Sequence, residues 1–322
     1  MECCHPPLPM VGADTPGAVG FRLSAPAKLN LYLHVTGRRD DGYHLLDSLV
    51  VFAAIGDGME VMASDNFSLA VTGRFAAALG DTASDDNLVM RAARLLHHEA
   101  GLPSGCGTAI HLEKRLPVAA GLGGGSADAA AALRGLCALW DISPGDDDLA
   151  RMAIFLGADV PACLARRPVF VGGIGESLHS APTLPETHVA LVNPGVALST
   201  ASVFAELEVD RPARDGRFTE APGDAAHFAA LLATHANDLE EVAKTLCPAV
   251  GEVLTILGRV PDCLLARMSG SGATCFGLFD TATAAAAAVR TIAEQQPAWW
   301  SVSAPLLSAA DEVAVSRIPA YM

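Results

Sequence analysis

A glycine-dense segment that runs directly into an alanine-rich stretch constrains this chain more than any other feature. Residues 117–128 read Pro-Val-Ala-Ala-Gly-Leu-Gly-Gly-Gly-Ser-Ala-Asp, and residues 127–140 are typical of a helix. Glycine adopts backbone angles closed to other residues and lets main-chain N–H groups approach a ligand. Because the first amides of a helix are unpaired and its N-terminal end is positive, the segment predicts a cradle for phosphate.

The common phosphate-binding motifs do not explain this spacing. No Gly-Lys-Ser/Thr ends the loop, and Ser126 stands where a dinucleotide-binding fingerprint needs its third glycine. A glycine cluster also suits a tight turn that only packs a helix on a strand. The segment alone leaves both interpretations open.

Residues 24–36 alternate between apolar and polar side chains, which is typical of a strand with one buried face. The alternation places Lys28, Asn30, Tyr32 and His34 on one face, and the apolar side chains at positions 29, 31, 33 and 35 on the other. Lys28 and Asn30 therefore point the same way. A strand whose polar face is solvated gives the same pattern.

A carboxylate follows the helix predicted over residues 144–156. Ser143 and Asp146 resemble a capping box, and Pro144 suits the first helical position. Asp159 then lies just beyond the helix end among apolar residues. It suits a cap or turn, or a base with few charged neighbours.

Two further segments complete the pattern. A glycine turn over residues 268–276 separates two short apolar runs and predicts a hairpin. A charged turn after residue 36 leads to Tyr43 and His44, and a turn alone does not explain an aromatic ring and an imidazole there.

Composition limits the function classes. A net charge of −15 over 322 residues argues against non-specific binding of nucleic acid. Five basic residues near the segments above nevertheless predict a locally positive cleft: Lys28, Arg38, Arg39, Lys114 and Arg115. Arg38 and Arg39 also suit a solvated turn.

Eight cysteines without a CxxC pair indicate neither a metal cluster nor a disulfide framework, and favour a reducing cytoplasm. No apolar run approaches the roughly 20 residues of a membrane span. We therefore expect a cytoplasmic protein that binds no membrane.

The periodicities predict a chain of mixed α/β content. The expected strands are 22–36, 44–54, 58–63, 67–71, 107–113, 168–171, 188–193, 263–268, 274–279 and 300–305. The expected helices are 87–100, 126–140, 144–156, 200–207, 224–233, 237–246, 248–258 and 281–295. Residues 210–223, rich in Pro, Gly and charge, predict a mobile surface loop.

Taken in this order, the segments resemble those of the GHMP small-molecule kinases. The resemblance spans about residues 22–305 and rests on five motifs: Ala-Pro-Ala-Lys-Leu-Asn-Leu, Asp-Gly-Tyr-His, Gly-Leu-Gly-Gly-Gly-Ser-Ala-Asp, Leu-Gly-Ala-Asp-Val-Pro and Ser-Gly-Ser-Gly-Ala. It implies an α/β (α+β) fold of two domains, the first ribosomal-S5-like and the second ferredoxin-like, with the active site in the cleft between them. The expected division is a flexible N-terminal extension over 1–20, an ATP-binding domain over 21–180 and a substrate-side domain over 181–322.

The resemblance also implies a chemistry. ATP donates its γ-phosphoryl group, with Mg²⁺ expected, to the 2-hydroxyl of a cytidine diphosphate-linked methylerythritol on the route to isoprenoid precursors. Asp159 would be the base and Lys28 the cation that orients the reacting oxygens. Asn30, Tyr43, His44 and Thr200 would contact the acceptor.

For the nucleotide, the resemblance implies a set of contacts in and before the glycine loop, with Ser126 available to Mg²⁺. They are Lys114, Pro117, Val118, Ala119, Ala120, Gly121, Leu122, Gly123, Gly124, Gly125, Ser126 and Ala127. Many members carry a second serine at the position of Ala127, so a role that needs two hydroxyls is in doubt here. The partners are expected to be small molecules, and the chain a monomer or weak homodimer.

Three alternatives remain. A sister kinase acting on homoserine, mevalonate or a sugar would share the loop, although the Asp-Gly-Tyr-His segment favours the cytidine-linked acceptor. A nucleotide sensor without activity would be expected to lack the base or the lysine, and both are present. A dinucleotide-dependent oxidoreductase is disfavoured by the glycine register.

Overall fold

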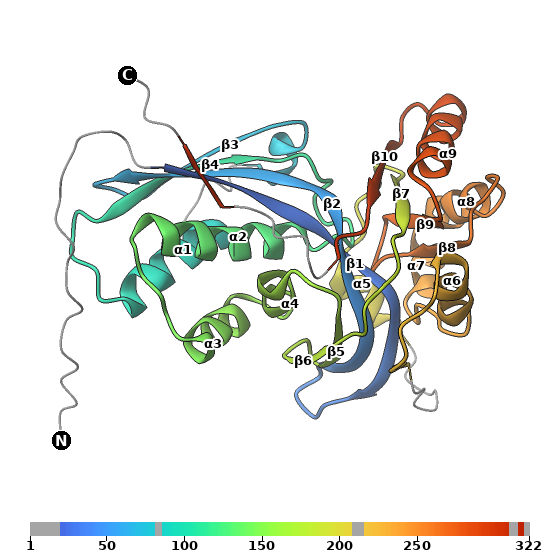
Figure 1. Ribbon diagram of the computed structural model, residues 1–322, viewed down its shortest axis with the longest axis horizontal. Coiled ribbons are helices and arrows are strands. Elements are labelled where there is room, and N and C mark those ends of the chain that lie inside the picture. Colours follow the sequence, from blue (N-terminus) through green and yellow to red (C-terminus); the bar gives the residue numbers. More distant parts are fainter. Residues whose placement is uncertain (1–19, 81–85, 208–215, 309–314, 319–322) are drawn as a thin grey trace.

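The computed structural model describes residues 20–80, 86–207, 216–308 and 315–318, which form two β-sheets covered by helices (Figure 1). The larger sheet has seven strands in the order β11-β1-β2-β4-β3, with β5 beside β2 and β6 beside β5. These strands are β1 (Gly20–Arg38), β2 (His44–Ser64), β3 (Ser68–Thr72), β4 (Gly107–Glu113), β5 (Val169–Gly173), β6 (Ser177–Ser180) and β11 (Ser316–Ile318).

Four helices lie along one face of the larger sheet (Figure 1). They are α1 (Leu88–Glu99), α2 (Gly124–Leu139), α3 (Asp146–Leu156) and α4 (Val160–Ala165), and a short 3-10 helix, η1 (Ala76–Leu79), precedes them. The alanines of α2 allow this helix to lie close to the strands. At Gly135, an added Cβ would lie only 2.7 Å from Leu23 Cδ1 on β1.

The smaller sheet has four antiparallel strands in the order β10-β7-β9-β8. The strands are β7 (His188–Asn193), β8 (Leu265–Met268), β9 (Cys275–Phe279) and β10 (Trp300–Pro305), and the helices are α5 (Thr200–Ala205), α6 (Ala225–Ala233), α7 (Glu240–Leu246), α8 (Pro248–Leu257) and α9 (Ala282–Gln295). Every residue of β7 is buried, because α7, α8 and α9 pack on one face of this sheet and α6 and the β1–β2 hairpin pack on the other.

One apolar cluster joins the two sheets. Leu29 and Leu31 of β1 pack with Leu191 of β7, Phe276 of β9 and Phe228 of α6 in a single core. Since both sheets contribute buried side chains to it, the two halves of the molecule share a hydrophobic core.

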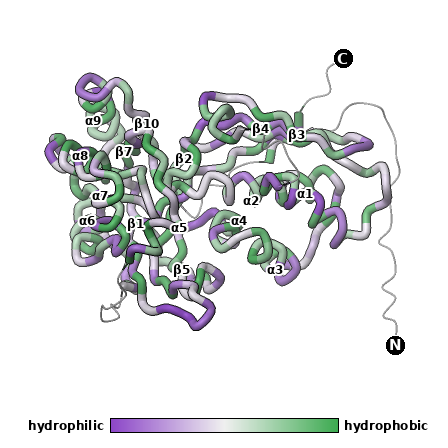
Figure 2. Tube along the Cα trace, turned by 180° about the vertical axis from the view of Figure 1, so that it is seen from behind, coloured by the Kyte–Doolittle hydropathy of each residue, from purple (hydrophilic) through white to green (hydrophobic). Residues whose placement is uncertain are grey.

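Strands β1 and β2 form a long hairpin that runs through both halves, and its tip is hydrophilic (Figure 2). The break predicted between strands 44–54 and 58–63 is wrong, because β2 is continuous and carries a bulge there. Pro26 pairs with Gly56, whereas Ala27 pairs with Ala53. At Gly56 an added Cβ would lie 2.1 Å from the carbonyl oxygen of Ala25, so this glycine permits a close approach of strands and not a turn.

The alternation predicted for residues 24–36 holds only as far as Asn30. Asn30 pairs with Val50 and Tyr32 with Leu49, so Leu31 forms a bulge. Because a one-residue shift exchanges the faces of a strand, Tyr32 no longer shares the face of Lys28 and Asn30. It packs instead in the shared core.

Other expectations meet mixed outcomes. The hairpin predicted over 268–276 is confirmed by the pairing of β8 with β9. The capping box is wrong: α3 begins at Asp146 after Gly145, with no side-chain cap. Helix α4 and strands β6 and β11 were not predicted. Residues 1–19 of the expected extension and residues 210–215 of the expected mobile loop lie outside the described residues.

Candidate active site

Lys28 and Asp159 meet although 131 residues separate them in the chain. Lys28 Nζ donates a hydrogen bond to Asp159 Oδ1 at 2.8 Å. Lys28 is held on β1 with 6% of its side chain exposed, whereas 46% of the Asp159 side chain is exposed. Asp159 occupies the N-cap position of α4, but its side chain makes no capping bond. Its carboxylate therefore binds Lys28 through Oδ1 and does not cap α4, so the alternative of a simple helix cap is excluded.

The glycine loop bends sharply into α2. Gly121 and Gly123 have φ values of +75° and +59°, which L side chains rarely adopt. Gly123 is the N-cap of α2, and no side chain of the described residues caps this N-terminus. Helix α2 thus starts at Gly124, earlier than predicted. Its first amides are left open toward the loop, which is the arrangement that binds anions.

Neighbouring elements bind the carbonyl oxygens of the loop one after another. Lys28 N donates to Leu122 O at 2.9 Å, Ser269 Oγ to Gly121 O at 2.9 Å, and Thr274 N to Ala120 O at 3.1 Å. The loop is therefore fixed both by β1 and by the β8–β9 turn.

A buried charge cluster lies beneath the loop. Lys114 Nζ donates to Asp57, and to Asp128 Oδ2 at 2.7 Å, and all three side chains are at most 4% exposed. Burial raises the pKa of Asp128 to about 7, and the nearby Lys114 ammonium opposes this shift. Asp57 also accepts the backbone N–H groups of Arg115 and Leu116, so it anchors the segment that leads into the loop.

A cavity of about 370 Å³, the loop cavity, opens above α2. Nine of the eleven predicted loop positions line it, as does Lys114: Pro117, Val118, Ala119, Ala120, Gly121, Gly123, Gly124, Gly125 and Ser126. The two other positions face cores, since Leu122 packs in the shared core and Ala127 packs against the larger sheet. A second hydroxyl at position 127 would thus point away from the loop cavity.

A second cavity of about 570 Å³, the hairpin cavity, lies beside β1 and β2. Lys28, Asn30, Tyr43, His44 and Asp159 all line it. Thr200 lines both the loop cavity and the hairpin cavity, so the two adjoin at this residue. The structure therefore brings all the predicted acceptor contacts together with the Lys28–Asp159 pair.

Sequence reasoning missed Phe204, which also lines the hairpin cavity. Its ring stacks on His44 with centroids 5.0 Å apart and an interplanar angle of 29°. Burial, followed by the nearby Arg38 charge, lowers the pKa of His44 below its usual 6.5. Only its place four residues after Thr200, on one turn of α5, could have drawn attention to Phe204.

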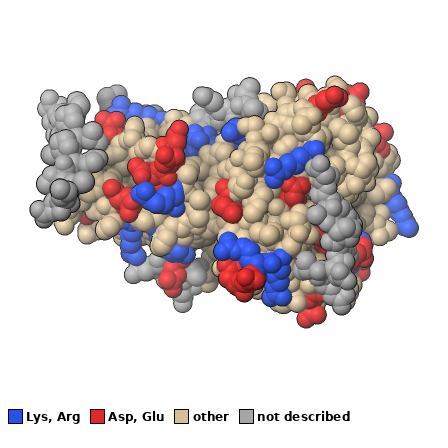
Figure 3. Space-filling view, turned by 90° about the horizontal axis from the view of Figure 1, so that it is seen from below, with Lys and Arg blue, Asp and Glu red and all other residues tan. Residues whose placement is uncertain are grey.

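The cleft is less positive than predicted. Of the five basic residues, four form ion pairs: Lys28 and Lys114 as described, Arg39 with Asp41 at 2.7 Å, and Arg115 with Glu113. Arg38 lines the hairpin cavity and has no carboxylate partner among the described residues. On the face drawn in Figure 3, basic and acidic side chains likewise stand next to one another in small groups.

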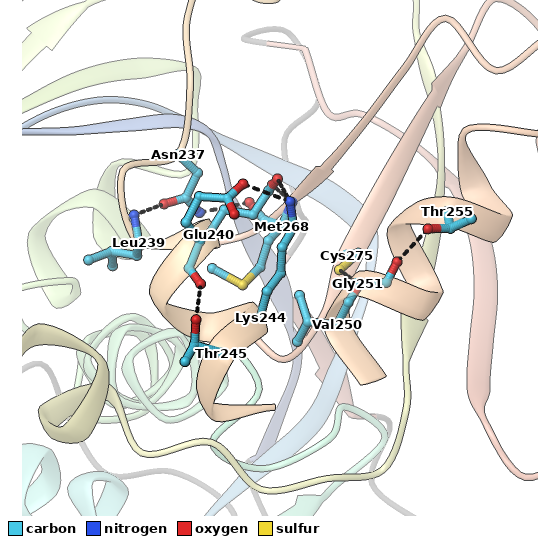
Figure 4. Close-up of polar contacts among 11 residues, drawn as sticks. Asn237, Leu239, Glu240, Lys244, Thr245, Val250, Gly251, Thr255, Met268 and Cys275 are labelled. Carbon is cyan, nitrogen blue, oxygen red and sulfur yellow. Dashed lines mark hydrogen bonds and ion pairs between the residues drawn. The ribbon is translucent and has the colours of Figure 1, made fainter. Parts of the chain in front are cut away.

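The β8–β9 turn is held by Asn237, which precedes α7, and by Glu240, the first residue of α7. Asn237 Nδ2 donates to the carbonyl oxygen of Met268, and Glu240 Oε2 accepts a hydrogen bond from Met268 N at 3.0 Å (Figure 4). Asn237 Nδ2 also donates to the carbonyl oxygen of Gly270. At the far side of the turn, Ser271 Oγ lies 2.7 Å from Thr200 Oγ1. These contacts hold the turn, whose Gly270 and Ser271 line the hairpin cavity.

Comparison with known proteins identifies the class. Residues 87–167 match the GHMP kinases N terminal domain, and residues 218–298 match the GHMP kinases C terminal domain. The chain therefore belongs to the GHMP kinase family and is a kinase of the expected two-domain architecture.

Relatives within the family are more specific. A protein of Paramagnetospirillum magneticum is 52% identical over 89% of this chain and 99% of its own length, and one of Parvibaculum lavamentivorans is 50% identical over 86% and 95%. Both are named 4-diphosphocytidyl-2-C-methyl-D-erythritol kinase. A solved structure of 4-(cytidine 5'-diphospho)-2C-methyl-D-erythritol kinase has a TM-score of 0.69 at 33% identity, covering 88% of this chain and 98% of that one.

Other members share the fold alone. Homoserine kinase from Cytophaga hutchinsonii has a TM-score of 0.69 at 16% identity, covering 96% of this chain and 100% of that one. Within the part of the chain that the structure describes, no helix has the length and apolar character needed to cross a membrane.

Proposed function

We propose that this kinase transfers the γ-phosphoryl group of ATP to the 2-hydroxyl of 4-diphosphocytidyl-2-C-methyl-D-erythritol, in the methylerythritol phosphate route to isoprenoid precursors. The observation that carries the proposal is the 2.8 Å Lys28–Asp159 pair, which stands in the hairpin cavity next to the loop cavity. The names of the 50%-identical relatives support the choice of acceptor.

In this proposal the hairpin cavity binds the acceptor. Asp159 takes the proton of the attacking hydroxyl, and Lys28 orients the hydroxyl and the transferred phosphoryl oxygens. Tyr43, with 62% exposure at the hairpin tip, and the stacked His44 and Phe204 offer ring surfaces for the cytosine. Asn30 and Thr200 lie where they can contact the polar part of the acceptor.

The loop cavity binds the triphosphate of ATP. The first amides of α2 and the loop from Pro117 contact the phosphates, and Lys114, whose ammonium is paired with Asp57 and Asp128, lines the base of the cavity. The described residues contain no cluster of three or more metal-ligating side chains. Mg²⁺ commonly takes most of its ligands from phosphates and water. Ser126 would hold it, and the ion would neutralise charge on the phosphates.

We place this reaction in the cytoplasm, with small-molecule substrates and a chain that acts as a monomer or weak homodimer. The acidic net charge of −15 is consistent with substrates other than nucleic acid. Sedimentation of the purified chain tests the oligomeric state.

A coupled assay of ADP release tests the function, with ATP and one acceptor at a time: the cytidine-linked methylerythritol, mevalonate or homoserine. We expect turnover with the first, with the product phosphorylated at the 2-hydroxyl by phosphorus NMR. Turnover with mevalonate only would refute the proposal.

A further inference from the structure

The side chain of Asn30, in the wall of the hairpin cavity, is held by Ser48 on β2. Asn30 Nδ2 lies 2.8 Å from Ser48 Oγ, and Ser48 Oγ lies 2.5 Å from the carbonyl oxygen of Tyr32. All three residues are almost completely buried, Ser48 being 1% exposed.

The chemistry of these groups allows one arrangement of protons. The carbonyl oxygen of Tyr32 only accepts hydrogen bonds, so the single proton of the Ser48 hydroxyl is donated to it. Ser48 Oγ can then only accept, and the amide of Asn30 must present its nitrogen. The orientation of an Asn amide is set by such a network, and here Ser48 turns Asn30 Oδ1 the other way.

Asn30 Oδ1 is buried and has no hydrogen-bond partner among the described residues. A buried carbonyl without a partner costs free energy and is rare in native proteins. The oxygen lies beside Gly270, which also lines the hairpin cavity: a Cβ on Gly270 would come within 3.2 Å of it. The acceptor oxygen that Ser48 leaves unused is thus at the cavity wall, on the same strand as Lys28.

We infer that Ser48 is a positioning residue, which fixes the Asn30 amide so that its oxygen accepts a hydrogen bond from a hydroxyl of the phosphoryl acceptor. The inference rests on the proposed function, because the acceptor supplies that hydroxyl. The Asn30 oxygen favours an acceptor molecule that presents a hydrogen-bond donor at this point, and Ser48 acts only through Asn30.

Steady-state kinetics of Ser48→Ala, Asn30→Ala and the double variant test this role. Without Ser48 the amide can flip, so Ser48→Ala should raise the acceptor KM about tenfold, the effect of one hydrogen bond, and leave the ATP KM unchanged. In the Asn30→Ala background the same change should have no further effect. Ser64→Ala, on the same strand outside both cavities, is the control. An equal rise in the acceptor KM on Ser48→Ala in the wild-type and Asn30→Ala backgrounds would overturn the inference.

A ligand-free measurement separates this inference from the proposed function. In ¹⁵N NMR of the wild-type protein, the Asn30 side-chain amide protons should exchange slowly with water, because Ser48 holds them, and faster in Ser48→Ala. The signals are assigned by their loss in Asn30→Ala. Fast exchange in the wild type would refute the amide lock, whichever acceptor the enzyme uses. No turnover of the cytidine-linked acceptor would refute the proposed function alone.

Discussion

Replacing Asp159 by asparagine removes the proposed base while retaining its shape. The amide oxygen of asparagine can still accept the hydrogen bond from Lys28 Nζ, which spans 2.8 Å in the wild type. Loss of a general base typically costs about 10²–10⁴-fold in rate. With about 1.36 kcal/mol for each tenfold change, the barrier should rise by about 2.7–5.4 kcal/mol.

Nucleotide affinity should be unaffected in Asp159→Asn, because Asp159 lines the hairpin cavity and not the loop cavity. The assay pairs kcat from coupled ADP release with calorimetric binding of a non-hydrolysable ATP analogue. Asp147→Asn, an exposed aspartate in the first turn of α3, is the control. A kcat within about threefold of the wild type would remove Asp159 from the base role. Loss of nucleotide binding together with turnover would show that the pair supports the loop instead.

Three further outcomes follow from the geometry. Phe204→Leu keeps an apolar side chain but removes the ring. Because stacking on a base is worth about 1–3 kcal/mol, the acceptor KM should rise about tenfold while the ATP KM stays constant. An unchanged acceptor KM would contradict the stacking role. The folded-state pKa of His44 is below 6.5, so the unfolded chain binds more protons there, and the free energy of unfolding falls as the pH drops from 6.5 through the lower value. Denaturant unfolding across this window should show a shallower pH dependence in His44→Gln. Gly121→Ala places a Cβ 2.2 Å from Ser269 O and should lower the free energy of unfolding by more than about 2 kcal/mol. The control Gly101→Ala is also at positive φ but has open space around it, and it should lower the free energy of unfolding by about 1 kcal/mol. Equal losses in Tm would refute the steric argument.

Local sequence signals predicted those parts of the site that depend on one segment at a time. The φ values at Gly121 and Gly123, the helix behind them and the β8–β9 hairpin all follow from short-range rules about glycine and periodicity. The convergence of Lys28 with Asp159 did not follow from such rules. It was expected from the order of the motifs and the resemblance that they carry.

What the sequence could not predict depends on contacts between distant segments. The bulge at Leu31 looks like ordinary alternation until β2 is paired with it. Gly56 reads as a turn because the close carbonyl of Ala25 belongs to another strand. Lys114 reads as a free cation because its partner Asp57 lies 57 residues away. Each error came from interpreting a strand or a charged residue without the segment that contacts it in the folded structure.

The β1–β2 hairpin has a consequence for engineering this enzyme. Lys28 lies on β1 and Tyr43 in the turn that connects β1 with β2, and apolar side chains of this hairpin pack in the core that both sheets share. Neither half can therefore be exchanged for that of another kinase to change the acceptor preference. Replacing the second sheet would leave Leu29 and Leu31 packed against side chains that do not fit them. Altered selectivity has to be sought by changing side chains in place along the hairpin.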